Sequence, residues 1–531
     1  MNKVYSTLAG KLDDQDQKYF MLLRDGNLES LWQWNEPLYH PTNDADANQV
    51  YDVAIIGGGI TGITTALLLQ KTGKKCIVIE KENLCFGTTG GTTAHLNTIV
   101  ETMPNTLIKD WGKEKAILVT QSLRDAIALI KNNVEFYNID CGFRETSAFF
   151  FSQTKEQSEG LDEVYEACKE VGLDVFYNLN LPFKIDFEKA MEAREHGKLH
   201  PVRYVYGLAK AFEEEGGVIL QHTTMTNVDD TDIINIETES GNFRAANIIY
   251  ATHIPPGINL LHLRLTPMRS YVMAFTVKNK KYPEDLAYDM YMPYHYIRSQ
   301  EIDGKKFMIV GGEDHKNGAT INTEASFLRL ESYIRKYFDV DEILFKWSAE
   351  FFDSADGLPY IGHLPGKPGN IFVATGYCGN GIVYSQVAAA VLKSLILNEE
   401  NAYIDLFDPN RVKPIAGFTE FVKHNVDVLK KFVGRWFDRD KLEEFAELAP
   451  GEGKVVSYEG HKMALYKDEH GELHAVNPVC THMKCDVAWN GAEQSWDCPC
   501  HGSRFSIDGK VLTGPAVYDL EKIEIRSLIE H

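Results

Sequence analysis

The hydrophobic positions near the start of the chain follow the order of a β-α-β unit. Residues 51–56 (Tyr-Asp-Val-Ala-Ile-Ile) form a short apolar run, which is typical of a buried parallel strand. Residues 60–72 then carry apolar side chains at helical spacing and contain no proline, and residues 76–80 are a second apolar run. The pattern therefore predicts a strand, a helix and a strand within about 30 residues.

From residue 100 to about residue 406 the pattern is a mixture of helices and strands. Helical spacing predicts helices over 116–133, 204–215 and 383–397. Short apolar runs predict strands at 218–221, 233–236, 247–251, 271–277, 307–310 and 370–375. This mixture predicts one large α/β (α+β) portion.

The pattern becomes all-β after the turn cluster Pro450-Gly-Glu-Gly453, with strands predicted at 455–457, 463–466 and 473–476. Before this turn, residues 418–432 have the apolar face of an amphipathic helix. Residues 1–49 are polar and irregular. We therefore expect four parts: a lead-in (1–49), the α/β portion (50–406), a helical connector (407–445) and a small β domain (446–531).

Composition excludes several classes of protein. The chain has 531 residues, of which 44% are hydrophobic and 24% are charged, as is usual for globular proteins. A formal net charge of −22 argues against a nucleic-acid partner and against an anionic membrane surface, since both need clustered Lys and Arg. No apolar run reaches the ~18 residues that a spanning helix needs, and the N-terminus lacks a secretory signal. We expect a cytoplasmic protein without a membrane span.

The glycines after the first strand fit the dinucleotide pattern G-x-G-x-x-G. Gly57 allows the tight turn, Gly59 lets the backbone approach a pyrophosphate, and Gly62 lets helix and strand pack closely. Glu80 ends the second strand, where a carboxylate can accept a hydrogen bond from a ribose hydroxyl. The alternative is a plain strand-to-helix turn, but the complete β-α-β context favours a nucleotide. A single fingerprint favours bound FAD and a hydride source other than NAD(P)H.

The C-terminal part carries two short motifs, Cys480-Thr-His482 and Cys498-Pro-Cys-His501, each with one Cys and one His ligand. A Rieske [2Fe–2S] cluster needs two thiolates on one iron and two imidazoles on the other. The same four ligands suit a structural zinc ion, although zinc fingers usually pair their cysteines with each other. The sequence therefore predicts a cluster held by Cys480, His482, Cys498 and His501.

Three further segments extend the nucleotide motif. Residues 88–95 (Thr-Thr-Gly-Gly-Thr-Thr-Ala-His) supply small residues and hydroxyls, and the segments 356–362 and 376–382 flank the late strand. From about 50 to 400 this order resembles the D-amino-acid-oxidase-like flavoprotein family, which includes glycine and sarcosine oxidases. The resemblance implies an FAD-binding Rossmann-type domain (about 50–100, 190–255 and 350–400) with an inserted β-sheet substrate domain (about 100–190 and 256–345).

The resemblance also implies the residues that contact FAD. His253 replaces the usual glycine after the strand at 247–251, which puts the shape of that turn in question. The late glycine turn and the start of the last helix would face the flavin, where a helix dipole stabilises negative charge. The implied contacts are Gly57, Gly59, Ile60, Thr61, Gly62, Glu80, Lys81, Thr88, Thr92, Thr93, Ala94, Val228, Asp356, Gly379, Asn380, Gly381 and Ile382.

The C-terminal part resembles the Rieske proteins of respiratory and photosynthetic bc-type complexes. The resemblance implies a disulfide between Cys485 and Cys500, and a hydrogen bond from Ser503 to the cluster that raises its potential. Phe505 stands where those proteins carry a Tyr, which implies a lower potential. The chain as a whole resembles bacterial fusions of the two domains, which implies a small all-β Rieske domain behind the flavoprotein.

This combination predicts a converter of electron pairs into single electrons. The resemblance implies that FAD takes a hydride from the C–N bond of an amine or amino acid, and that the cluster passes the electrons to an unidentified acceptor. Two alternatives stay open. An external redox partner could feed a flavin reductase through the Rieske domain, or an oxidase could use O2 and keep the cluster for a structural or sensing role.

Three residues are candidates for direct contact with the substrate. Arg298 could clamp a substrate carboxylate with Tyr296 donating a hydrogen bond, or it could form a structural ion pair within a strand. His95 could be bonded covalently to the flavin, but a loop histidine that is only hydrogen-bonded near the flavin is the simpler interpretation.

Overall fold

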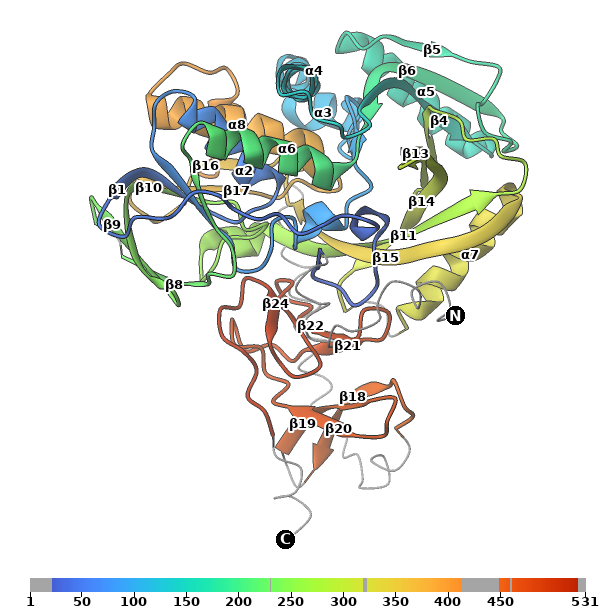
Figure 1. Ribbon diagram of the computed structural model, residues 1–531. Coiled ribbons are helices and arrows are strands. Elements are labelled where there is room, and N and C mark those ends of the chain that lie inside the picture. Colours follow the sequence, from blue (N-terminus) through green and yellow to red (C-terminus); the bar gives the residue numbers. More distant parts are fainter. Residues whose placement is uncertain (1–21, 230, 319–321, 412–447, 459–460, 524–531) are drawn as a thin grey trace.

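A computed structural model describes residues 22–229, 231–318, 322–411, 448–458 and 461–523. The expected amphipathic helix at 418–432 lies outside the described residues. Figure 1 shows a large α/β body with a small all-β unit below it. Within the described residues no helix is long and apolar enough to cross a membrane.

The first sheet of the body is built around the predicted β-α-β unit. Strand β1 (Val50–Ile56) lies in its centre and pairs in parallel with β2 and β10. Its other members, in sheet order, are β16 (Tyr360–His363), β17 (Ile371–Thr375), β10 (Gly241–Tyr250), β2 (Cys76–Ile79) and β7 (Val218–Leu220). In addition β9 (Ile234–Thr238) pairs with β10, and β8 (Met225–Val228) pairs with β9.

Both faces of β1 are covered, which explains its continuous apolar run. Val53 and Ile55 pack in the core that contains helices α2 (Ile60–Gln70), α6 (Pro201–Glu214) and α8 (Gly381–Leu397). Ala54 and Ile56 face the opposite core, together with residues of β9. The parallel order and the buried faces are those of a doubly wound nucleotide-binding sheet.

The second sheet is the predicted inserted one, and it is mostly antiparallel. Its order is β15 (Val340–Ser354), β11 (Leu265–Val277), β14 (Lys305–Lys316), β13 (Tyr296–Ile302), β12 (Leu286–Asp289), β4 (Arg144–Ser152), β6 (Lys189–Lys198) and β3 (His95–Leu96), with β5 (Val175–Tyr177) beside β6. Ile297 faces the core under α7 (Glu324–Tyr337), whereas its neighbour Tyr296 faces the main core of the body. The alternation along β13 therefore directs Tyr296 inward.

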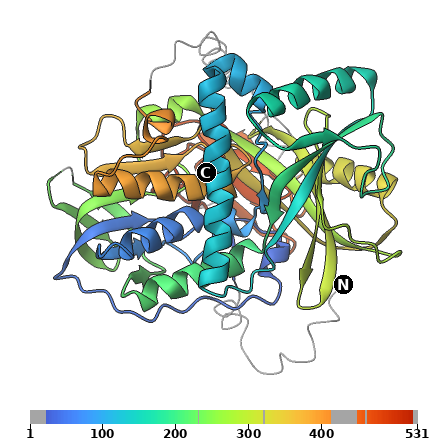
Figure 2. The ribbon, with the colours of Figure 1, turned by 90° about the horizontal axis from the view of Figure 1, so that it is seen from above.

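Helix α4 (Lys113–Phe136) joins the two halves of the body. It packs against α8 of the first half and against β6 of the second. Figure 2 shows it running between these halves. The smaller elements are α3 (Pro104–Trp111), α5 (Lys155–Glu170), α9 (Ile404–Phe407), η1 (Leu31–Gln33), η2 (Thr88–Gly90) and η3 (Leu260–Arg264).

The C-terminal unit has two small antiparallel sheets around its own core. One is β18 (Gly453–Tyr458), β19 (His461–Lys467) and β20 (Leu473–Val476), and the other is β21 (Ala488–Asn490), β22 (Ser495–Asp497), β23 (Arg504–Phe505) and β24 (Val511–Thr513). Trp496 and Phe505 are fully buried in this core. The second sheet lies next to the body, and the first lies farther away (Figure 1).

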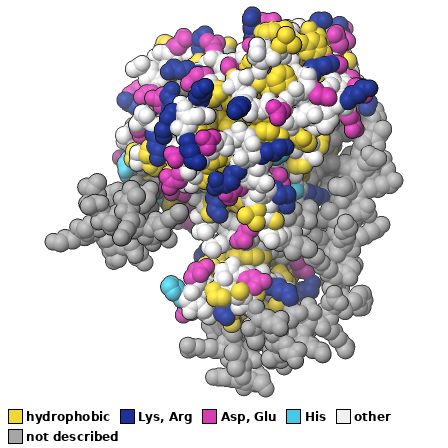
Figure 3. Space-filling model, turned by 90° about the vertical axis from the view of Figure 1, so that its right-hand side faces the viewer, with side chains coloured by type: hydrophobic (Ala, Val, Ile, Leu, Met, Phe, Trp, Pro, Cys, Tyr) yellow, Lys and Arg dark blue, Asp and Glu magenta, His cyan; other side chains and the backbone are white. Residues whose placement is uncertain are grey.

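The described part of the lead-in is irregular but firmly packed. Trp32 is fully buried and its indole N–H donates to the carbonyl oxygen of Thr92. Ser30 donates to the carbonyl oxygen of Gly90 over 2.7 Å. The lead-in therefore covers the outside of the 88–95 segment. On the face shown in Figure 3, basic and acidic side chains are interspersed and do not form one broad basic area.

Candidate functional site

A cavity of about 400 Å³ lies between the two sheets of the body. The glycine turn after β1 forms one part of its wall, and residues of β12, β13 and β14 form another. The C-terminal unit contributes residues 511–517 to the same wall. This volume lies in the range of small-molecule sites.

The turn after β1 leaves no room for side chains. A Cβ atom on Gly57 would lie 2.5 Å from the carbonyl oxygen of Ala251, and one on Gly62 would lie 1.9 Å from the carbonyl oxygen of Gly57. Gly57 also has a φ of +110°, which strongly favours glycine. The start of α2 can therefore lie against the strand and direct its free N–H groups into the cavity.

Glu80 lies beside the turn, as the nucleotide motif predicts. One carboxylate oxygen accepts a hydrogen bond from the N–H of Gly58 over 2.6 Å, and the other accepts from the N–H of Glu82 over 2.9 Å. Burial raises the pKa of Glu80. The side chain lines the cavity, where it can meet a hydroxyl donor.

His95 lines the cavity and is the donor end of a hydrogen-bond chain. Its Nδ1 atom lies 2.7 Å from the hydroxyl of Tyr288, which donates to Oδ1 of Asn97 over 2.7 Å. Because that hydroxyl gives its hydrogen to Asn97, it accepts from Nδ1–H of His95, and Nε2 keeps its lone pair. Nε2 is buried and has no hydrogen-bond partner among the described residues. Burial lowers the pKa of His95 well below its usual value.

Arg298 does not line the cavity. Its guanidinium donates to the carbonyl oxygens of Thr93 and Ala94, each over 2.7 Å, and also bonds Gln300. The side chain is fully buried, with its guanidinium over the ring of Trp32. The expected clamp on a substrate carboxylate is therefore not supported by this geometry, because the donors are already used to brace the 93–94 turn.

Two half-buried acids, which sequence reasoning did not single out, line the cavity. Glu101 accepts a hydrogen bond from the hydroxyl of Tyr294 over 3.1 Å, and Asp314 accepts one from Ser270. Burial is the main cause that raises the pKa of Glu101 to about 8 and that of Asp314 to about 7. Ser270 in turn lies 2.8 Å from the hydroxyl of Tyr296, which lines the cavity as predicted. Glu101 lies in the loop before α3 and Asp314 lies on β14. Because the two acids come from distant parts of the chain, no local motif marks either of them.

The C-terminal unit gathers the two Cys-His motifs into one centre. Cys480 and Cys498 are buried and reduced, and the rings of His482 and His501 lie 5.1 Å apart. The Nδ1 atoms of both histidines are buried without a partner among the described residues. Two thiols and two unpaired imidazole nitrogens are the donor set of a Rieske cluster. A disulfide joins Cys485 to Cys500, so the predicted pairing is confirmed.

Comparison with known families now decides the assignment. The family model described as DAO, FAD dependent oxidoreductase, matches residues 52–395. The model of the Rieske [2Fe-2S] domain matches residues 439–524.

The chain belongs to this family of FAD-dependent oxidoreductases. It carries a C-terminal Rieske domain, and its cofactors are FAD and a [2Fe–2S] cluster. YhfW of Bacillus subtilis, named as a Rieske 2Fe-2S iron-sulfur protein, is 31% identical over 89% of this chain and 93% of its own length. Gamma-glutamylputrescine oxidoreductase of Escherichia coli is 21% identical over 69% of this chain and 88% of its own length.

Solved structures support the same fold. Glycine oxidase from Geobacillus kaustophilus superposes with a TM-score of 0.59 at 21% identity, covering 68% of this chain and 99% of its own. L-Proline dehydrogenase from P. horikoshii gives a TM-score of 0.55 at 18% identity, covering 68% of this chain and 98% of its own. At these identities the likeness shows the fold alone.

Most of the predicted FAD contacts line the cavity. Those that do are Gly57, Gly59, Ile60, Thr61, Glu80, Lys81, Thr88, Thr92, Thr93, Gly379, Asn380, Gly381 and Ile382. Gly62 lies behind the turn, and Ala94 gives its carbonyl oxygen to Arg298. The close fit of the glycine turn, and a lining that runs from this turn to the late glycine segment at 379–381, suit FAD.

Two predicted contacts lie elsewhere. Both carboxylate oxygens of Asp356 accept from Arg411, over 2.7 and 2.8 Å, and neither residue lines the cavity. Val228 lies beyond the cavity wall, which at this end is formed by residues 223–225. The structure thus does not place Val228 or Asp356 on the cavity wall, and Asp356 is engaged in an ion pair with Arg411.

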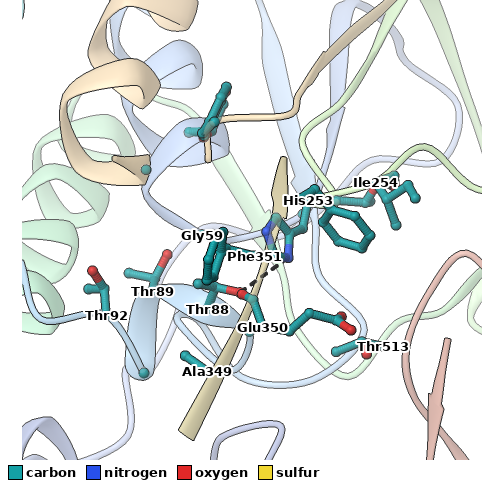
Figure 4. Close-up of a pocket in the computed structure, with 18 of the residues that line it drawn as sticks. Gly59, Thr88, Thr89, Thr92, His253, Ile254, Ala349, Glu350, Phe351 and Thr513 are labelled. Carbon is teal, nitrogen blue, oxygen red and sulfur yellow. Dashed lines mark hydrogen bonds between the residues drawn. The ribbon is translucent and has the colours of Figure 1, made fainter. Parts of the chain in front are cut away.

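His253 adopts a backbone conformation that is typical of glycine. Its φ is +69°, in the region that favours glycine. Its Nδ1 atom lies 3.1 Å from the hydroxyl of Thr88, and its ring packs edge-on against Phe352 with centroids 4.7 Å apart. Figure 4 shows His253 and Thr88 facing each other across the cavity wall, with Thr513 of the Rieske domain close by. The contacts with Thr88 and Phe352 therefore stabilise a backbone conformation that is unfavourable for a residue other than glycine.

The cluster ligands of the Rieske domain face the flavoprotein. His482 Nε2 lies 3.1 Å from the carbonyl oxygen of Gly257, which follows the His253 turn by four residues. The ring of His262 lies 4.7 Å from that of His482 and 5.7 Å from that of His501. Lys81 donates to the carbonyl oxygen of Val511, in the Rieske segment that lines the FAD cavity. The two cofactor sites thus share one interface.

A buried ionic network fixes this interface. Asp497 of the Rieske domain pairs with Arg269 of β11 over 3.0 Å and with Arg504 over 3.3 Å. Arg504 also reaches Asp25 of the lead-in over 3.3 Å, and their side chains are at most 4% exposed. The remaining contacts run from Glu493 to Arg24 over 3.5 Å and to Ser348 over 2.7 Å. Since breaking a buried pair strands a charge, this network resists separation of the domains.

Proposed function

We propose that the protein oxidises a C–N bond of an amine or amino acid and passes the electrons one at a time through the Rieske cluster to a separate acceptor. When bound, FAD supplies two-electron hydride acceptance, and the [2Fe–2S] cluster supplies one-electron transfer. Overall, the substrate and one water would yield a carbonyl compound, an amine or ammonia, two electrons and two protons.

The observation that carries the proposal is the shared interface. His253 lines the FAD cavity, and Gly257 of the same loop accepts the hydrogen bond from His482 over 3.1 Å. Four residues of backbone and one hydrogen bond therefore connect the cavity wall to a cluster ligand. The segment 511–517 adds a second connection, because it lines the cavity from the Rieske side.

The proposed roles of this chain's residues follow from their positions. The turns around Gly57–Gly62 and Gly379–Ile382 would hold FAD, and Cys480, His482, Cys498 and His501 would hold the cluster. Tyr296 and His95 would face the substrate, because both line the cavity beside β12 and β13. The relatives named as gamma-glutamylputrescine oxidoreductase and glycine oxidase support an amine or amino acid as the substrate class.

Anaerobic mixing of the holoprotein with a panel of amines and amino acids tests the proposal. Visible absorption follows the flavin, and low-temperature EPR follows the reduced cluster. We expect a Rieske-type signal to appear as the flavin bleaches. The variant Cys498→Ser serves as the control, since its flavin should bleach without that signal.

Two outcomes would contradict the proposal. If the flavin bleaches while the cluster stays oxidised and O2 restores the flavin equally fast in Cys498→Ser, the protein is an oxidase with a separate cluster. If no amine or amino acid bleaches the flavin, but a reduced ferredoxin does so rapidly, the electrons enter through the Rieske domain.

A further inference from the structure

We propose that the substrate is recognised as a cation, an amine whose ammonium group binds between Glu101 and Asp314 inside a ring of tyrosines, and not as an amino acid held by its carboxylate. This inference rests on the proposed function and names the substrate class of the same site. Its basis is the part of the cavity wall formed by β12, β13, β14 and the loop before α3.

Three tyrosine rings surround this part of the cavity. The ring centroids of Tyr288 and Tyr294 lie 6.3 Å apart, and those of Tyr294 and Tyr296 lie 5.9 Å apart. Each hydroxyl already has a partner, in Asn97, Glu101 and Ser270 respectively. The hydroxyls are thus fixed, and one face of the Tyr288 ring is covered by Phe150, which stacks on it with the centroids 4.9 Å apart. The remaining ring surface of the three tyrosines lines the cavity and is open to a ligand. Aromatic faces attract ammonium groups and repel anions.

The charged groups here are negative. Glu101 and Asp314 line the cavity, and the negative charges of Asp314 and Asp353 both act on Glu101. Among the described lining residues, the only Lys or Arg side chain is that of Lys81. Its ammonium group donates to the carbonyl oxygen of Val511 and also lies 3.9 Å from the carboxylate of Glu82. A carboxylate ligand would therefore meet acids without a compensating cation.

The nearest cation to these acids is already paired. The positive charge of His295 favours the ionised form of Asp314. However, Nδ1 of His295 lies 2.8 Å from the carboxylate of Asp289, and its Nε2 lies 3.7 Å from the carboxylate of Glu313. Its side chain does not line the cavity. Arg298, the residue that could have clamped a carboxylate, is used up by backbone carbonyl groups.

His95 points to the same ligand by an independent observation. It is 9% exposed and lines the cavity, and its Nε2 atom has no partner among the described residues. The bond of Nδ1 to Tyr288 makes Nε2 an acceptor. An acceptor needs a donor, which the N–H groups of an ammonium ion supply and a carboxylate lacks.

The same acids can prepare the amine for oxidation. An ammonium ion has no lone pair, so it must lose a proton before its α-carbon can give up a hydride. We assign that proton to the carboxylate of Glu101: an N–H bond breaks, an O–H bond forms on Glu101, and the neutral amine remains. Burial raises the pKa of Glu101 to about 8, which brings it closer to that of an alkylammonium group at about 10.

A matched pair of ions tests the sign of the recognised charge. tert-Butylammonium and pivalate have the same branched hydrocarbon group and opposite charges. The ammonium ion has no hydrogen on the carbon next to nitrogen and cannot be oxidised to an imine. Titration into the oxidised holoprotein is followed by the change in flavin absorption. We expect tert-butylammonium to bind and pivalate to cause no change at the same concentrations. Tighter binding of pivalate would overturn the inference.

Variants locate the binding. Glu101→Gln and Asp314→Asn should each weaken tert-butylammonium binding by about 10- to 100-fold, because each removes a charged partner. Glu301→Gln is the control, since Glu301 lies on β13 but is exposed and pairs with Lys306. Flavin content and circular dichroism report whether each variant folds. Unchanged binding in both folded variants would overturn the inference. If one variant fails to fold, the comparison of tert-butylammonium with pivalate in the wild-type protein decides the question.

The outcome also separates this inference from the proposed function. If amino acids bleach the flavin and amines do not, the recognition of a cation is wrong while C–N oxidation stands. If tert-butylammonium binds through Glu101 but no amine bleaches the flavin, the cation site stands while C–N oxidation is wrong.

Discussion

The two redox sites of this protein are built in opposite ways. All four cluster ligands lie between Cys480 and His501, on two loops tied together by one disulfide. The wall of the FAD cavity is drawn from residues as far apart as Gly57 and Ile382, and from the Rieske domain as well. The cluster site is thus a local motif, whereas the flavin and substrate site exists only when both sheets are in place.

The difference extends to what holds each region in position. The Rieske domain has its own core around Trp496, but it is joined to the body by the ionic network of Asp497, Arg269 and Arg504. The His482 ligand ends on the carbonyl oxygen of Gly257. The local motif can form by itself, yet its place beside the flavin depends on long-range charge pairs.

Removal of one cluster ligand should abolish the cluster and leave the flavin site intact. In Cys498→Ser we expect total loss of the Rieske EPR signal with FAD still bound, because no cluster ligand takes part in the glycine turns. Flavin and iron contents measured on the same sample check this. The control Cys168→Ser, at a buried position of α5, should keep both cofactors. Loss of FAD together with the cluster would show that the two sites are not independent.

Disruption of the ionic network should lower the free energy of unfolding more than disruption of a surface ion pair does. Arg269→Met leaves Asp497 with one arginine fewer in a buried site, so the free energy of unfolding should fall by about 3–5 kcal/mol. Urea unfolding followed by fluorescence measures it. Lys131→Met removes the exposed pair with Glu145, and the free energy of unfolding should fall far less than in Arg269→Met, because surface pairs contribute little. Equal losses in the two variants would contradict the role of the buried network.

Binding of tert-butylammonium should strengthen as pH rises from 6 to 9. The carboxylate of Glu101 is the form that binds a cation, and its pKa is raised to about 8 by burial and by Asp353 and Asp314. Below that pKa, binding should weaken by about tenfold per pH unit. Asp314, whose pKa is about 7, also becomes ionised over this range and strengthens the binding as the pH rises. The Gly379 N–H and the Tyr294 hydroxyl favour the ionised form of Glu101.

The dissociation constant measured at each pH checks this, with Glu101→Gln for comparison. That variant should lose the part of the dependence near pH 8 and keep the part due to Asp314. A binding constant that is independent of pH in the wild-type protein would exclude these acids as the cation partners.

The smallest effect is expected at Ser503. Its side chain is hydrogen-bonded to Cys480 and accepts a bond from the N–H of Ala516 over 3.0 Å. Ser503→Ala should lower the cluster potential by about 40 mV, since a hydrogen bond of about 1 kcal/mol is lost from the more negative reduced state. A redox titration followed by EPR measures the shift. An unchanged flavin potential in the same titration serves as the control.

Sequence reasoning succeeded where a few neighbouring residues determine the structure. The glycine turn at 57–62 and the Cys-His motifs were visible in short segments, and the bond between Cys485 and Cys500 was implied by the resemblance to other Rieske proteins. Strand β15 was missed because Val340–Phe345 carries Asp and Glu among its apolar residues and lacks strict alternation.

The substrate site could not be predicted in the same way. Arg298 stands two residues after Tyr296 on the same face of β13, but Thr93 and Ala94 from a distant turn take up its donors. Asp356 is likewise taken by Arg411. Glu101 and Asp314 carry no motif, and only the packing of the loop before α3 against the second sheet places them on one cavity.

We propose that electrons pass from flavin to cluster within one docked chain. Freeze-quench EPR after rapid anaerobic mixing with a reducing amine, at two widely different protein concentrations, tests this transfer directly. We expect the cluster signal to grow at the same rate at both concentrations, because His482 already contacts the flavoprotein. A rate that rises in proportion to concentration, or a cluster that stays oxidised after the flavin has bleached, would contradict it.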